Sequence, residues 1–230
     1  MTKTSRCPVL TIDGPSGAGK GAVSARVATA LGWGVLDSGA VYRSVALAAL
    51  TNKTDLADET ALTALCADLD LGFEPGPDGI QACLGGRRLG DALRAEEVGV
   101  ASSQVAALPG VRAALLDLQR AFRAVPGLVA DGRDMGTVVF PDAEAKVFLD
   151  ASVEERARRR YRQLKANGDD VTFDRLISDL QARDRRDRER TVSPTLPADD
   201  AVVVDSTSLG LEEVVERVLA VVTERVFDRS

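Results

Sequence analysis

The sequence predicts an α/β fold built on a doubly wound, five-stranded parallel sheet with a small antiparallel insertion. Three observations support this prediction: five short apolar runs, helical periodicity in the segments between them, and one stretch in which turn residues break the alternation. Hydrophobic residues make up 45% of the 230-residue chain, which is enough to build a sizeable core for one domain with an appendage.

The five apolar runs are typical of strands that are buried on both faces of a parallel sheet. Helical periodicity fills the gaps between the runs, so the predicted order of elements alternates between strand and helix. The runs lie at residues 8–12, 34–36, 127–131, 145–149 and 201–204.

Two of the helices have clear sequence signals. Val23, Val27 and Leu31 recur at i, i+4 and i+8, and Gly32 follows them as a helix stop. A C-terminal helix is marked by apolar residues at helical spacing, namely Leu211, Val215, Val218 and Val222.

The stretch between the second and third predicted strands departs from this pattern. Between Cys66 and Val98, short strand-like runs are separated by the turn signals "PGPDG" and "GG". We therefore predict an inserted subdomain at residues 66–98 and a core formed by residues 7–65 and 99–228. A long surface loop is the alternative.

The composition limits which side chains are available for catalysis and metal binding. The chain has no histidine, so it lacks the commonest general base and metal ligand, and any catalysis must use carboxylates, Arg, Lys, hydroxyls and a bound metal ion. Phosphoryl transfer suits this inventory, because its catalysis is mostly positioning and charge stabilisation. Three cysteines, Cys7, Cys66 and Cys83, lie far apart without C-x-x-C spacing, which argues against a disulfide framework and a zinc site.

The charge pattern argues for a local anionic ligand. The net charge of −6 and the small number of aromatic residues argue against a general nucleic-acid-binding protein, yet arginines are concentrated between Arg156 and Arg190. The N-terminus lacks the plan of a signal peptide, and no apolar run approaches the roughly 18 residues that cross a bilayer. We expect a cytoplasmic protein with no membrane or nucleic-acid partner.

The strongest local motif is "GPSGAGKGA" at residues 14–22. Gly14 can turn the chain tightly, Gly17 and Gly19 let backbone N–H groups approach an anion, and Lys20 adds a positive charge. An apolar run precedes the motif and a helical pattern follows it, which favours a phosphate-binding loop over a plain glycine-rich turn. The residues of the predicted phosphate-binding loop and the start of its helix are Gly14, Pro15, Ser16, Gly17, Ala18, Gly19, Lys20, Gly21 and Ala22.

Further motifs extend over nearly the whole chain, and together they resemble those of bacterial cytidylate kinases, which are P-loop nucleoside monophosphate kinases. The motifs are "TIDGPSGAGKG", "LDSGAVYR", "SQVAALPGVR", "ADGRDMGTVVFPDA" and "RD.RD..R". The resemblance implies a sheet of the P-loop kinase type with a monophosphate-binding insertion and a helical lid, here at about residues 153–172. It also implies transfer of the γ-phosphoryl group of ATP to CMP or dCMP with Mg²⁺. A kinase for UMP and a nucleotide-binding module with impaired catalysis are the alternatives.

By the same resemblance, Ser38, Tyr42 and Arg43 hold the acceptor nucleotide, Arg133 binds its phosphate and Asp134 binds the cytosine ring. A carboxylate can accept a hydrogen bond from the exocyclic amine of cytosine, whereas uracil presents an acceptor there. The other acceptor residues that the resemblance implies are Ser103, Arg112, Arg183, Asp187 and Arg190.

Simpler explanations exist for some of these residues. Asp37 and Ser38 can cap a helix, and Tyr42 can fill the core. Helical spacing continues the apolar face of Leu176 and Leu180 into the arginines and aspartates that follow, which a solvated helix face with i, i+4 ion pairs would also explain.

The catalytic residues that the resemblance implies are Lys20, Asp131, which binds Mg²⁺ through water, and two lid arginines, Arg156 and Arg159. The lid helix begins at a possible capping box of Ser152 with Glu155. Its apolar stripe, which consists of Ala157, Tyr161 and Leu164, leaves the arginines mostly outward. We expect a monomer.

Ala22 departs from the family, which usually has Thr or Ser at this position. A hydrogen bond to a charged group contributes about 1.5–3 kcal/mol, so its loss would weaken nucleotide or magnesium binding without removing the site. Ser16, Ser24 or a bridging water could replace the hydroxyl.

Overall fold

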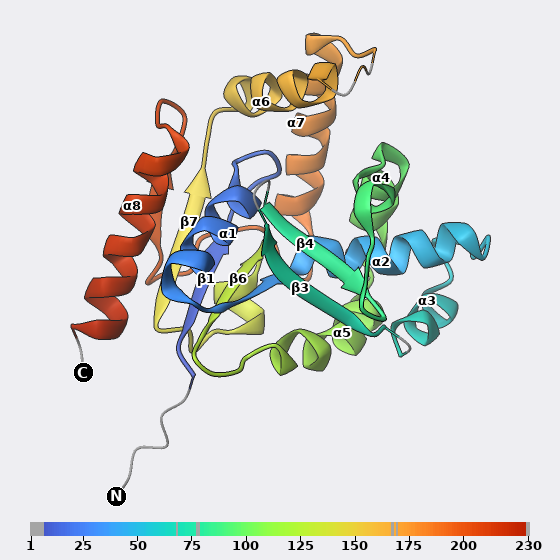
Figure 1. Cartoon of the computed structure of the whole chain (residues 1–230). Helices are drawn as coiled ribbons and strands as arrows, with labels where there is room; N and C mark the ends of the chain where they lie inside the picture. The colour runs from blue at the N-terminus through green and yellow to red at the C-terminus, as the bar shows by residue number, and fades with distance from the viewer. Residues whose placement is uncertain (1–6, 68, 77–78, 167, 169, 229–230) are drawn as a thin grey trace, which may run out of the picture.

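The computed structural model describes residues 7–67, 69–76, 79–166, 168 and 170–228, and it contains the predicted five-stranded parallel sheet (Figure 1). The strands run in the order β2-β6-β1-β7-β8, and all four pairings are parallel. Each strand lies within a residue or two of its predicted position. The strands are β1 (Val9–Asp13), β2 (Gly34–Asp37), β6 (Leu128–Gly132), β7 (Ala145–Asp150) and β8 (Val202–Asp205).

Both faces of the sheet are covered, as the consecutive apolar residues of its strands require. Along β1, Val9 packs into one core and Leu10 and Ile12 pack into the other. The first core includes side chains of α2, α3, α4 and α5, and the second includes side chains of α1 and α8. The sheet therefore separates two hydrophobic cores, which is the doubly wound arrangement that the sequence predicts.

The helices alternate with the strands as expected. α1 ends at Gly32, whose left-handed conformation caps the helix, and α8 begins at the first of the four apolar residues that predict it. No helix in the described part of the chain is both long and apolar enough to cross a membrane. The helices are α1 (Lys20–Leu31), α2 (Ser38–Thr51), α3 (Glu59–Cys66), α4 (Glu96–Val105), α5 (Pro109–Ala121), α6 (Val153–Ala166), α7 (Phe173–Glu189) and α8 (Leu211–Val222).

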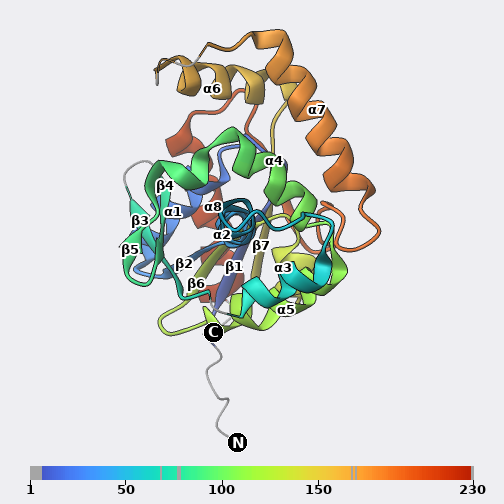
Figure 2. The same ribbon diagram turned by 90° about the vertical axis from the view of Figure 1, so that its right-hand side faces the viewer.

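A second, antiparallel sheet lies between β2 and β6 in the chain, and its strands are β3 (Leu71–Gly76), β4 (Gly79–Leu84) and β5 (Arg87–Arg88). This sheet falls inside the predicted insertion, although part of the "PGPDG" turn, residues 77–78, lies outside the described residues. Ile80 packs into the core that α1 shares with α8. The insertion therefore packs against α1 and the edge strand β2 rather than lying apart from the core (Figures 1 and 2).

Helix α6 falls within residues 153–172, where the lid is predicted, and it lies with α7 above the carboxyl end of the sheet (Figure 1). Ala157 of α6 and Leu176 and Leu180 of α7 form a small core of their own, to which Tyr161 and Leu164 add, as the apolar stripe predicts. Two details of the prediction for this region are wrong, and both concern its first turn.

The capping box at the start of α6 is only half formed. The Glu155 N–H donates to Ser152 Oγ at 3.3 Å, but the Glu155 carboxylate turns to Arg158 and Arg159. Arg156 was expected to point outward but is only 3% exposed. It is buried because its guanidinium finds acceptors on neighbouring segments, which helical periodicity alone does not reveal.

Candidate active site

The loop at residues 14–19 joins the carboxyl end of β1 to α1, where ligands bind in doubly wound sheets. Gly14 is required by a close approach, because a Cβ there would lie 2.0 Å from the carbonyl oxygen of Leu149 on β7. Gly17 and Gly19 have φ values of +81° and +96°, the left-handed region that favours glycine. The loop thus turns tightly against the sheet and places the N-terminus of α1 at the carboxyl ends of the strands.

Lys20, the first residue of α1, is 6% exposed. Its Nζ donates to the Pro15 carbonyl at 3.0 Å and lies 3.9 Å from Asp131 Oδ1 at the end of β6. Burial and repulsion from Arg133 lower the pKa of Lys20, whereas burial raises the pKa of Asp131. The two opposite charges stabilise each other in a place where either alone would be costly.

A cavity of about 400 Å³ lies over this loop. Its walls come from the loop and α1, from the insertion, and from α6 and α7. The lining residues from the predicted site are Ser16, Gly17, Gly19, Gly21, Ala22, Arg43, Arg159 and Arg183. We call it the donor cavity, because it contains the predicted phosphate-binding loop.

A smaller cavity of about 50 Å³ gathers nine of the ten predicted acceptor residues from five separate helices and strand ends. The nine are Ser38, Tyr42, Ser103, Arg112, Arg133, Asp134, Arg183, Asp187 and Arg190. The tenth, Arg43, lines the donor cavity instead. We call this smaller cavity the acceptor cavity. Arg183 lines both cavities, so they adjoin at this residue.

The deepest part of the acceptor cavity is a buried ion pair between Asp134 and Arg112. Asp134 is 2% exposed, and Arg112 also donates to the Ala106 carbonyl at 3.2 Å and lies over the Tyr42 ring, 5.5 Å from its centroid. Tyr42 both packs in the core and lines the cavity, so the two explanations for it are compatible. A planar ring that entered here would meet one carboxylate and one guanidinium in fixed positions.

The mouth of the acceptor cavity is built around Asp187 of α7, which is 6% exposed. Its Oδ2 accepts a hydrogen bond from Arg133 Nε at 3.3 Å, and its Oδ1 forms an ion pair with Arg190 Nη2 at 3.2 Å. Three buried polar atoms in this cavity have no hydrogen-bond partner in the part of the chain that the structure describes: Ser103 Oγ, Arg183 Nε and Arg190 Nε. Unpaired donors of this kind fit a polar ligand better than a solvated helix face.

The arginines at the junction of the cavities repel one another. Burial and the charges of Arg133 and Arg43 lower the pKa of Arg183 to about 10, with Asp187 opposing the shift. Burial also lowers the pKa of Arg43, and Arg133 adds to the effect. Three guanidinium groups held this close are suited to an anion that carries more than one negative charge.

The prediction missed Asp13, the last residue of β1 and the residue before the phosphate-binding loop. Its carboxylate accepts from the N–H groups of Met135 and Gly136, each at 2.8 Å, and so holds the turn that carries Asp134. Burial is the main reason that the pKa of Asp13 is raised to about 7. A carboxylate at the end of a predicted strand is the only signal that the sequence offers for it.

The donor set around Asp131 fits a magnesium ion that is held mainly by phosphate oxygens and water. Asp131 is close to the start of α1, since a Cβ on Gly21 would lie 3.6 Å from its Oδ2. Ala22 lines the donor cavity without a hydroxyl, and Ser24 is fully buried and lines neither cavity, which leaves Ser16 as the loop hydroxyl that faces the donor cavity. Mg²⁺ typically keeps several waters and takes only one or two carboxylates, so this sparse set is sufficient.

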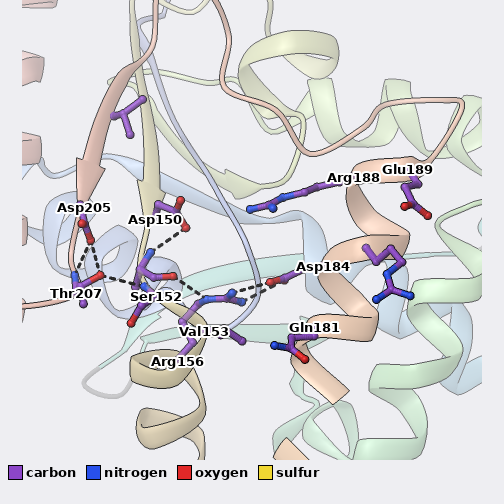
Figure 3. Close-up of a pocket in the computed structure, with 13 residues that line it drawn as sticks. Asp150, Ser152, Val153, Arg156, Gln181, Asp184, Arg188, Glu189, Asp205 and Thr207 are labelled. Atoms are coloured by element: carbon purple, nitrogen blue, oxygen red, sulfur yellow. Dashed lines mark hydrogen bonds and ion pairs between the residues drawn. The ribbon is translucent and has the colours of Figure 1, made fainter. Parts of the chain in front are cut away.

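The two predicted lid arginines donate hydrogen bonds to carbonyl groups of the loop. Arg156 Nη1 donates to the Ser16 carbonyl at 2.9 Å, and both of its Nη atoms bind Asp184 of α7, at 3.1 and 2.6 Å (Figure 3). Arg159 Nη1 donates to the Ala18 carbonyl at 3.1 Å, and its Nη2 donates to the Ser206 carbonyl at 2.6 Å. Both side chains therefore hold the backbone of the loop by hydrogen bonds.

A larger groove of about 710 Å³ lies on the other side of the Arg156–Asp184 pair, between α7 and the ends of β7 and β8 (Figure 3). It contains no residue of the glycine-rich loop and none of the predicted acceptor residues. We therefore place the chemistry in the donor and acceptor cavities and not in this groove.

A sequence profile and several similar proteins all belong to one family. The sequence profile of the family described as cytidylate kinase matches residues 10–224. Proteins named cytidylate kinase from Aeromonas salmonicida (strain A449) and Stutzerimonas stutzeri (strain A1501) are 55% and 56% identical to this chain over 223 and 220 residues. These alignments cover 97% of both chains in the first case, and 95% of this chain and 96% of the relative in the second. A third, from Pseudomonas aeruginosa (strain UCBPP-PA14), is 56% identical over 92% of this chain and 93% of the relative.

Proposed function

The chain belongs to the cytidylate kinase family, and on this premise we propose that it transfers the γ-phosphoryl group of ATP to CMP or dCMP, giving CDP or dCDP. The observation that carries the proposal is the meeting of the two cavities at Arg183, one built on a phosphate-binding loop and the other on a buried carboxylate that suits cytosine. We propose that ATP and CMP or dCMP are its partners, and that it works as a monomer in the cytoplasm without nucleic acid or membrane.

On the donor side, the proposal assigns the phosphates of ATP to the loop at residues 14–22 and to the N-terminus of α1. Backbone N–H groups and the positive end of the helix favour an anion there, and Lys20 adds a charge close to the transferred group. In the free protein Lys20 is held by the Pro15 carbonyl and Asp131, so its charge is already in place before ATP binds.

We assign Mg²⁺ to the side of the loop that Asp131 faces, with Asp131 binding it through water. When bound, the ion supplies charge neutralisation between the phosphoryl groups of ATP. The raised pKa of Asp131 means that its carboxylate binds a cation best once it has lost its proton.

On the acceptor side, Arg43, Arg133 and Arg183 would hold the phosphate of CMP at the junction of the cavities. Asp187 is assigned to the ribose hydroxyls, and Asp134 to the exocyclic amine of cytosine. Uracil would place an acceptor against this buried carboxylate, which disfavours UMP. The remaining polar residues of the acceptor cavity, Ser38, Tyr42, Ser103, Arg112 and Arg190, would complete the pocket for the base.

The reaction needs no general base, because the attacking atom is an oxygen of the CMP phosphate that is already ionised. A new bond forms between this oxygen and the γ-phosphorus, the bond from the γ-phosphorus to the bridging oxygen breaks, and ADP leaves. The chain's part is to hold the two phosphates in line and to neutralise the charge between them. The walls that α6, α7 and the insertion add to the donor cavity would limit the access of water and so suppress hydrolysis of ATP.

A coupled assay for nucleoside diphosphate formation tests the proposal, with ATP and Mg²⁺ and with CMP, dCMP, UMP or AMP as acceptor. We expect turnover of CMP and dCMP far above that of UMP and AMP. Binding of ATP without turnover of any acceptor would favour the binding module, and a preference for UMP would favour the other kinase.

A further inference from the structure

The loop presents two of its carbonyl groups to arginines of α6. Arg156 Nη1 donates a hydrogen bond to the Ser16 carbonyl at 2.9 Å. Arg159, one turn later, donates to the Ala18 carbonyl at 3.1 Å. In a planar trans peptide the carbonyl and the following N–H point in opposite directions. Fixing these two carbonyls toward α6 therefore fixes the N–H groups of Gly17 and Gly19 away from α6.

These two N–H groups have no hydrogen bond within the described residues, and Gly17 is exposed and Gly19 half-buried, so both are available to a ligand. Both belong to glycines with positive φ, so the backbone alone leaves the orientation of each peptide adjustable. The loop needs an external constraint to hold both N–H groups toward one point, and the two arginines supply it through the carbonyl groups of the same peptides.

Arg156 is itself held rigidly. Its side chain is 4% exposed, its Nε donates to the Ala151 carbonyl at 3.0 Å, and its two Nη atoms bind both carboxylate oxygens of Asp184 (Figure 3). Gly17 packs directly on it, because a Cβ at Gly17 would lie 3.2 Å from Arg156 Cβ. A guanidinium held by four hydrogen bonds and covered by the loop is not free to reach a phosphoryl group in the donor cavity.

We infer that Arg156 and Arg159 are positioning residues that orient the Gly17 and Gly19 N–H groups toward the phosphates of the donor nucleotide, and that Asp184 holds Arg156 in place for this task. The inference rests on the proposed function, and it assigns the two lid arginines a role different from direct contact with the transferred group. It also connects α7 to the loop, because Asp184 lies on the same helix as Arg183 and Asp187 of the acceptor cavity.

The test is the affinity of the free enzyme for Mg·ADP, measured by calorimetric titration together with its affinity for CMP. We expect Arg156→Met and Arg159→Met each to weaken Mg·ADP binding about ten- to a hundredfold, since each loses a charge-assisted hydrogen bond to the loop. Arg156→Lys should recover part of the loss, and Asp184→Asn should lose less than Arg156→Met. Affinity for CMP should change less than about threefold in all four variants.

Arg162→Met is the matched control, because Arg162 is an exposed arginine of the same helix that lines neither cavity. It should leave both affinities unchanged. Unchanged Mg·ADP affinity with a large loss of kcat at saturating substrates would overturn the inference in favour of direct contact with the transferred group. Parallel weakening of ADP and CMP would overturn it in favour of a role in holding the fold. Failure of the proposed function is recognised separately, because the wild-type enzyme would then not turn over CMP.

Discussion

Replacing Arg183 by Met is predicted to make the free protein more stable while it removes most of its activity. Arg183 Nε is buried without a partner in the described chain, and leaving such a donor unpaired costs about 1–3 kcal/mol. Burial and the nearby Arg133 and Arg43 lower its pKa from its ordinary value to about 10, which corresponds to a cost of about 3 kcal/mol for keeping the charge there.

These two figures describe overlapping costs, so they are not added. The lost attraction to Asp187 is small, because Asp187 keeps Arg133 and Arg190 as partners. Met retains an unbranched apolar stem of similar length. We therefore expect the free energy of unfolding of Arg183→Met to exceed that of the wild type by about 1–3 kcal/mol.

The measurement is urea denaturation of both proteins without nucleotide and with saturating CMP. CMP should stabilise the wild type and have much less effect on the variant, whose kcat/KM for CMP should fall at least about a hundredfold, as expected for a lost charge-assisted contact with the acceptor phosphate. Arg186→Met, at an exposed position of the same helix, should change the free energy of unfolding by no more than about 0.5 kcal/mol. A variant that is less stable than the wild type, or that still turns over CMP well, would refute the reasoning.

Three further predictions follow from other parts of the site. Ala22→Thr should lower KM for ATP about tenfold, because the added hydroxyl supplies a hydrogen bond to a charged group at the donor cavity; an unchanged KM would contradict this. Asp13→Asn should remove a pH dependence of the free energy of unfolding. The pKa of Asp13 is about 7 in the native state and 3.8 in the unfolded state, so the native state binds the proton more tightly. The free energy of unfolding of the wild type should therefore fall by up to about 1.4 kcal/mol per pH unit as pH rises from about 4 to 7. Urea melts of both proteins at several pH values test this, because the difference between their slopes cancels the contribution of groups that both share, such as Asp131 and Lys20, and parallel slopes would contradict it. Gly17→Ala should weaken Mg·ADP binding and lower the free energy of unfolding by at least about 1–2 kcal/mol, since Gly17 has φ +81° and touches Arg156; calorimetry and urea melts check both, and a neutral substitution would contradict the strained geometry.

Local signals predicted the fold well because each strand is a continuous apolar run and each lies between recognisable helices. Gly32 and the apolar spacing of α1 and α8 were sufficient for those helices. On α7, helical spacing placed Asp187 on the side of Leu176 and Leu180, and the structure buries all three. Periodicity succeeds there because the buried face of the helix is continuous.

The environment of Arg156 and Asp13 could not be predicted in this way. The buried Arg156 guanidinium donates a hydrogen bond to the carbonyl of Ser16, which lies 140 positions earlier in the chain. The Asp13 carboxylate accepts hydrogen bonds from N–H groups that lie 122 and 123 positions later. Such contacts depend on how the segments meet at the edge of the sheet, and neither spacing nor composition carries that information. The roles of both residues emerge only when the loop, the lid and the turn after β6 are seen together.

The most direct test of the account is the ratio of kcat/KM for CMP to kcat/KM for UMP, measured for the wild type and for Asp134→Asn. The ratio within one protein is independent of the active fraction, which matters because the substitution leaves Arg112 without its buried partner. We expect a high ratio for the wild type and a fall of about ten- to a hundredfold in the variant, whose amide no longer excludes the uracil carbonyl. A ratio that does not change would contradict the assignment of Asp134 and, with it, the identity of the acceptor cavity.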